Sequence, residues 1–115
     1  MIATAKAKYI RGSARKSRLV IDQIRGLSVG RALEILEFSP KRAAHHVKEC
    51  LKSAIANAQE KDTMIDPDDL IVSRATVDQG PAMKRIRPRA MGRAFRVKKR
   101  FNHITIELDS AAAEE

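Results

Sequence analysis

The 115-residue chain has little of what builds disulfide-bonded, membrane-spanning or aromatic-rich proteins. It contains one cysteine, Cys50, no tryptophan and only 3% aromatic residues. A single cysteine excludes an internal disulfide and gives no sign of an oxidising compartment. No apolar run approaches the roughly 20 residues that span a bilayer, and the N-terminus lacks the features of a secretory signal. We therefore expect a cytoplasmic protein, a single domain over residues 1–115 with one modest core and no membrane partner.

Acidic residues are missing from two stretches, one before Asp22 and one between Asp78 and Glu107. The chain has 23 Lys and Arg against 14 Asp and Glu, a net charge of +9. Such one-sign blocks repel themselves unless an anion neutralises them, which favours a nucleic-acid partner over a merely solvated basic face. The candidate RNA-binding residues are the bases of the two stretches: Lys6, Lys8, Arg11, Arg15, Lys16, Arg18, Lys84, Arg85, Arg87, Arg89, Arg93, Arg96, Lys98, Lys99 and Arg100.

Hydrophobic periodicity predicts an α+β fold with three helices packed on a small antiparallel sheet and a long protruding β-hairpin. Ser13 and Ser28 suit the N-caps of two helices, Gly26 suits a left-handed helix end, and Ser39-Pro40 predicts a third helix with proline in its first turn. Strands are expected over residues 2–10, 70–77 and 95–108.

Three finer expectations concern side-chain facing. Alternation over residues 2–10 places Tyr9 on the same side as Ala3, Ala5 and Ala7. Leu19, Val20 and Ile24 are expected to share the buried face of the first helix. The apolar positions change from odd to even near Asn102-His103, which predicts a bulge or a change of facing there.

Residues 79–103 are predicted to form the extended basic hairpin. Pro81 and Pro88 lack amide donors, so this stretch cannot be a central strand. Gly92 suits the turn, and arms of roughly 13 residues would reach about 40 Å. The few apolar side chains cannot offset the entropy of ordering the arms, so we expect the far end to be ordered by its partner. A disordered basic arm is the alternative, which the flanking strands disfavour.

Catalytic and metal-binding residues are not predicted, and no cofactor is implied. His45 and His46 are adjacent, so on a helix they point about 100° apart and cannot hold one metal together. His103 stands alone on a strand, and Cys50 is expected to be a buried structural thiol. We therefore do not expect an enzyme.

A helix-turn-helix DNA regulator is the main competing interpretation, because the first two predicted helices are joined by a short turn. The second helix, however, carries Glu34 and Glu37 and only one base, Arg31, which suits a DNA groove poorly. An architectural DNA-binding arm stays open on physical grounds. Comparing affinity for duplex DNA with affinity for folded RNA would separate these possibilities.

The hairpin sequence resembles one family in particular, that of bacterial large-subunit ribosomal protein twenty-two. The resemblance covers nearly the whole chain and stops around Leu108. The motifs that carry it are Gly80-Pro81-Ala82-Met83-Lys84-Arg85, Pro88-Arg89-Ala90, Gly92-Arg93-Ala94, His103-Ile104-Thr105, Arg18-Leu19-Val20, Ile24-Arg25-Gly26, Ala32-Leu33-Glu34-Ile35-Leu36 and Ser53-Ala54-Ile55-Ala56-Asn57-Ala58.

The resemblance implies a structural protein of the large ribosomal subunit. It implies a body on the subunit surface that binds ribosomal RNA, supports assembly and contacts neighbouring ribosomal proteins. It also implies that the hairpin tip, Met91, Gly92, Arg93 and Ala94, lines the nascent-peptide exit tunnel near the macrolide site and meets the nascent peptide. Many relatives carry a basic residue where this chain has Met91.

Overall fold

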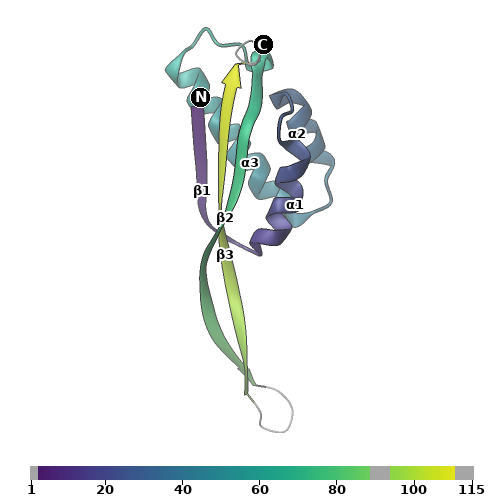
Figure 1. The fold of residues 1–115 in the computed structure, drawn as a ribbon, viewed down its shortest axis with the longest axis vertical. Helices are drawn as coiled ribbons and strands as arrows, with labels where there is room; N and C mark the ends of the chain where they lie inside the picture. The colour runs from purple at the N-terminus through teal and green to yellow at the C-terminus, as the bar shows by residue number, and fades with distance from the viewer. Residues whose placement is uncertain (1–2, 89–93, 111–115) are drawn as a thin grey trace.

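Three helices cover one face of a three-stranded sheet, and two of the strands continue past the body as a hairpin (Figure 1). The computed structural model describes residues 3–88 and 94–110, with the backbone alone for residues 83–88 and 94–98. The elements are β1 (Ala3–Arg11), α1 (Ala14–Ile24), α2 (Val29–Phe38), α3 (Arg42–Lys61), a short 3-10 helix η1 (Pro67–Asp69), β2 (Leu70–Pro88) and β3 (Ala94–Ser110). The predicted α+β fold is confirmed.

The sheet is antiparallel with strand order β1-β3-β2, so β3 is central and β2 is an edge strand. This agrees with the two prolines of β2, since an edge strand tolerates missing amide donors. The last residue of β1, Arg11, pairs with Phe101. Beyond it, residues 82–88 pair with 94–100 as a two-stranded ribbon, which spans about 23 Å at 3.3 Å per residue.

The core lies between the helices and one face of the sheet. On β3 the even positions Ile104, Ile106 and Leu108 are fully buried, as the period of two requires. The helices contribute the predicted apolar stripes, and the buried residues of α3 include Val47 and Leu51. No helix of the described residues lies on the opposite face of the sheet (Figure 1).

The irregularity predicted near Asn102-His103 exists, but it lies in the neighbouring strands. β1 has one extra residue between Ala7 and Ile10, and β2 has one extra residue between Gln79 and Ala82. β3 itself continues without a bulge, so the bulge was predicted at the right position but in the wrong strand. The alternative, a change of facing, depends on the side chains of Phe95 and Val97, which are not among the described side chains. In the β1 bulge Tyr9 adopts φ 58° and is 64% exposed. Its expected place beside the buried alanines is therefore wrong, because the extra residue reverses the alternation.

The helix ends agree with the predictions except in detail. Ser13 and Ser28 occupy the N-cap positions, but neither side chain makes a capping hydrogen bond. Gly26 has φ +83°, as expected of a left-handed helix end. The third helix begins at Arg42, so Pro40 precedes its first turn instead of lying within it. Leu19 is 52% exposed, whereas the buried face of α1 comprises Ser17, Val20, Ile21 and Ile24.

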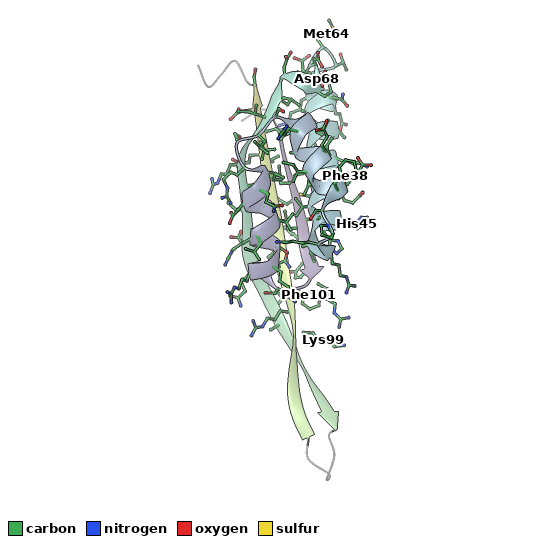
Figure 2. The ribbon with its side chains drawn as sticks, turned by 90° about the vertical axis from the view of Figure 1, so that its right-hand side faces the viewer. Phe38, His45, Met64, Asp68, Lys99 and Phe101 are labelled. Atoms are coloured by element: carbon green, nitrogen blue, oxygen red, sulfur yellow. The ribbon has the colours of Figure 1, made fainter. Side chains whose placement is uncertain are left out.

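The molecule is elongated, measuring 64 × 25 × 21 Å. Figure 2 shows Phe101 and Lys99 where the hairpin leaves the body, and Met64 and Asp68 at the opposite end. No helix in the described part of the chain is both long enough and apolar enough to cross a membrane.

Candidate nucleic-acid interface

A buried asparagine ties the base of the hairpin to the turn between β1 and α1. Asn102, on β3, is fully buried. Its amide nitrogen donates to the Gly12 carbonyl at 3.1 Å, and its amide oxygen accepts from the Ser17 hydroxyl at 3.4 Å. The Gly12 N–H donates to the Arg100 carbonyl at 2.9 Å. These bonds place the start of α1 against the two strands at the point where they leave the body.

A second contact set surrounds His103, which lies between the two bulges. Its Nδ1 accepts a hydrogen bond from the Tyr9 N–H at 3.0 Å, and the two rings meet edge to face with centroids 4.9 Å apart. On the other side, a Cβ built on Gly80 would lie 3.1 Å from His103 Nε2 and 3.1 Å from the Phe101 carbonyl oxygen. Glycine is therefore needed for the close approach of β2 to β3. The bulges and the histidine between them determine where the ribbon leaves the sheet.

Six predicted RNA-binding residues come together around this point, and we call them the hairpin-base cluster: Lys8, Arg11, Arg15, Lys16, Lys99 and Arg100. All are exposed except Lys99, which is half-buried. Within the part of the chain whose side chains are described, none of them forms an ion pair with a carboxylate. Uncompensated positive charge of this density attracts a polyanion.

The first turns of α1 and α3 strengthen this field. Neither turn contains an acidic residue, although acids are the residues that stabilise a helix N-terminus. Arg15 and Lys16 occupy the first turn of α1, and Arg42 begins α3. Bases at these positions add to the positive end of the helix dipole, and an external anion would relieve the resulting repulsion.

Two arginines of the α1 region have a structural role at the edge of the sheet. The guanidinium of Arg18, a predicted RNA-binding residue, donates from Nε and Nη2 to the Val77 carbonyl at 3.1 and 3.0 Å. Arg25 donates in the same way to the Ala75 carbonyl at 3.2 and 2.8 Å, and it pairs with Asp22 at 2.8 Å. These side chains satisfy carbonyls along the outer edge of β2, which protects that edge from pairing with another strand.

The remaining predicted RNA-binding residues lie on either side of the hairpin-base cluster, one on the sheet and the others on the ribbon. Lys6 is exposed and pairs in register with Thr105, farther up the sheet from the hairpin base. The ribbon contains five further predicted residues, and its backbone pairing places Lys84 opposite Lys98. The five are Lys84, Arg85, Arg87, Arg96 and Lys98. Two bases opposite each other are unfavourable in an isolated ribbon. Arg89, Met91, Gly92 and Arg93 lie outside the described residues, and Ala94 is the first residue of β3.

Acidic residues gather at the end of the body away from the hairpin. The loop after α3 carries Asp62, Asp66, Asp68 and Asp69. Asp68 lies at this end in Figure 2, whereas Lys99 lies at the hairpin base. The charges seen in the sequence as separate blocks are thus separated in space, along the long axis of the molecule.

The fold also creates a basic pocket that sequence reasoning missed. It lies between the β1–α1 turn and the start of α3 and has a volume of about 670 Å³. Besides Arg11 and Lys16 it brings in Lys41, Arg42 and His46. These residues lie outside the acid-free stretches, so charge patterning gave no signal for them. The one available sign was Leu19, an apolar residue that helical periodicity assigns to the core but that lines this pocket instead.

Groups with catalytic potential are few in this structure. Cys50 is buried, as predicted, and burial raises the pKa of its thiol to about 11, which keeps it protonated and unreactive near neutral pH. The rings of His45 and His46 are inclined at 67° to each other. Across residues 3–88 and 94–110, no three His, Cys, Asp or Glu side chains gather so as to hold a metal ion.

Comparison with known proteins gives the same family from two directions. A family model described as "Ribosomal protein L22p/L17e" matches residues 5–109. A relative from Acaryochloris marina (strain MBIC 11017), named large ribosomal subunit protein uL22, is 55% identical over 111 residues, covering 96% of this chain and 92% of the relative. A relative of the same name from Anaeromyxobacter sp. (strain Fw109-5) is 48% identical over 107 residues, covering 93% of this chain and 74% of the relative.

Proposed function

Because this chain belongs to the ribosomal protein L22p/L17e family, we propose that it is a structural, non-enzymatic protein of the large ribosomal subunit in the cytoplasm. The two relatives described above carry the name of a large-subunit protein. In this role the chain binds ribosomal RNA, supports assembly of the subunit and contacts neighbouring ribosomal proteins. No chemistry is required of it beyond binding.

The observation that supports RNA binding is the separation of charge along the molecule. Cations that pair with no carboxylate of the described residues gather at the hairpin base, and the acidic loop after α3 lies at the other end. The ribbon that leaves the basic end contains no acidic residue. Arginine in such a cluster grips phosphate oxygens in pairs. Each neutralised phosphate also releases counter-ions, which makes binding strong and salt-dependent.

The ribbon supports the second part of the proposal, that the hairpin enters folded RNA and its tip, Met91 to Ala94, lines the exit tunnel beside the nascent peptide. β2 and β3 pair beyond the end of β1, and within the described part of the chain no further strand or helix lies beside them (Figure 1). An isolated two-stranded ribbon is marginal in water, so a surrounding partner is needed to hold it. RNA helices, with phosphates on every side, suit a ribbon that carries bases on both arms.

A DNA regulator fits the structure less well. α2, which would be the recognition helix, buries Val29, Ala32 and Leu36 against the body. Its exposed residues include Glu34 and Glu37, which duplex phosphates would repel. The cations lie instead on α1, on the start of α3 and on the ribbon.

The experiment is to express the tagged chain in bacteria and to sediment ribosomal subunits through sucrose in high salt. We expect the chain to travel with the large subunit, and purified chain to bind large-subunit ribosomal RNA more tightly than duplex DNA of equal length. Recovery only in the soluble fraction, or equal affinity for both nucleic acids, would contradict the proposal. The tunnel position has a separate test: deleting Met83, Lys84 and Arg85 should change the response of ribosomes to a macrolide, and an unchanged response would refute it.

A further inference from the structure

The basic pocket between the β1–α1 turn and the start of α3 has the size and shape of a small-molecule site. Its volume of about 670 Å³ lies within the range of pockets that hold drug-sized ligands. Residues about 30 positions apart in the sequence form its sides, namely Lys16 and Leu19 from α1 and Ala43 and His46 from α3. Because both helices pack on the sheet, the pocket is part of the rigid body and not of the ribbon.

Part of the lining of the pocket is apolar. Ile10 and Ala43 are half-buried and pack against the core, while Leu19 is 52% exposed. A leucine that lines a cavity with half of its surface in water leaves apolar area uncovered. None of these three side chains is aromatic, but their apolar surface can accept the face of an unstacked base.

The rest of the lining is largely cationic. It includes Arg11, Lys16, Lys41 and Arg42, and His46 adds a ring with a polar nitrogen. Among the described residues that line the pocket, none is acidic. An inorganic anion would satisfy these cations but leave the apolar residues uncovered, and an apolar ligand would do the reverse. A nucleotide has both parts, a negative phosphate and a planar base with polar edges.

We propose that this pocket takes one unpaired nucleotide of ribosomal RNA, an inference that rests on the proposed function. The base lies against Leu19, Ile10 and Ala43, the phosphate is held by Arg11, Lys16 and Arg42, and His46 faces a polar edge of the base or ribose. Single-stranded bulges and loops are where RNA offers such a nucleotide. The pocket thus adds recognition of one extruded base to the non-specific attraction of the hairpin-base cluster.

The first test uses a variant that leaves the charge unchanged. Leu19→Ala shortens the apolar wall, whereas Met64→Ala shortens an 88% exposed side chain at the far end of the body. Each purified variant is titrated with transcribed large-subunit ribosomal RNA. We expect Leu19→Ala to weaken binding about three- to tenfold, because an apolar contact with a base contributes part of what stacking on an aromatic ring contributes. We expect Met64→Ala to bind like the wild type. If the wild type binds and Leu19→Ala binds equally well, the pocket inference is wrong and the proposed function stands.

The second test does not depend on RNA binding by the whole chain. Methyl NMR signals of Ile10, Leu19 and Ala43 are followed as adenosine monophosphate, inorganic phosphate or a polyglutamate peptide is added. We expect the monophosphate to shift all three methyl groups and phosphate to shift none of them. Equal shifts with phosphate would make this an anion site only, shifts with the peptide alone would make it a protein-docking site, and no shift at all would remove the site.

Discussion

Replacing Asn102 by alanine removes only a few atoms but should strongly destabilise the junction between the body and the hairpin. The side chain is fully buried, donates to the Gly12 carbonyl at 3.1 Å and accepts from the Ser17 hydroxyl at 3.4 Å. Its removal leaves the half-buried Gly12 carbonyl without this donor and the buried Ser17 hydroxyl without its acceptor, which costs about 1–3 kcal/mol, and leaves a small cavity besides. We expect the free energy of unfolding to fall by about 2–4 kcal/mol in urea, with an unchanged dependence on urea concentration.

Two companion variants make the reasoning about Asn102 refutable. Ser17→Ala removes only the longer of the two bonds, so it should cost less than about 1 kcal/mol. Asn102→Asp keeps the acceptor for Ser17 but places carboxylate oxygen against the Gly12 carbonyl, so it should be at least as harmful as alanine at neutral pH. If Asn102→Ala costs no more than Ser17→Ala, or if aspartate is milder than alanine, the bond to Gly12 does not stabilise the junction.

Three other predictions concern the body of the protein. Gly80→Ala should destabilise the chain by about 1–2 kcal/mol because its Cβ would crowd His103 Nε2. A Cβ at Gly30 meets nothing within 4 Å, so the control Gly30→Ala in α2 should be neutral or stabilising. Equal effects of the two substitutions in urea titrations would contradict this prediction. Burial raises the pKa of the Cys50 thiol from 9.0 to about 11. The thiol's contribution to stability is therefore complete below pH 9 and is lost as pH rises from 9 to 11, by up to about 3 kcal/mol. Cys50→Ala should lack this part of the decline, and parallel pH profiles of stability for the two proteins would refute the prediction. Arg25→Gln removes both hydrogen bonds to the Ala75 carbonyl and should lower the free energy of unfolding by about 1 kcal/mol, while affinity for ribosomal RNA stays within twofold of the wild type. A large loss of affinity at unchanged stability would show instead that Arg25 contacts RNA.

Local patterning was sufficient for most of the architecture. The alternation in Ile104, Ile106 and Leu108 and the helical stripe containing Val47 and Leu51 depend only on the side-chain periods of strand and helix. The prolines of β2 correctly excluded a central strand. The acid-free basic segment with its glycine and two prolines predicted the hairpin that β2 and β3 form, whereas RNA binding by this segment stays a prediction.

What could not be predicted depends on contacts between distant segments. The β1 bulge places a tyrosine, not a glycine, at positive φ, and its N–H bonds to His103, more than 90 residues away in the chain. The roles of Arg18 and Arg25 at the edge of β2 are invisible in a charge count, since both appear there simply as bases. The pocket, with Arg42 and His46, exists only because α3 starts beside the β1–α1 turn.

We expect RNA phosphates, and not the chain's own carboxylates, to neutralise the cations of the hairpin base. The most direct measurement is the salt dependence of binding to large-subunit ribosomal RNA for a triple variant, Arg11→Gln, Arg15→Gln and Lys16→Gln. Its matched control carries the same change at three exposed bases elsewhere, Arg31, Lys52 and Arg74. We predict that the logarithmic slope of affinity against salt becomes shallower by about two in the hairpin-base variant and hardly changes in the control. Equal slopes in both variants and the wild type would contradict the claim.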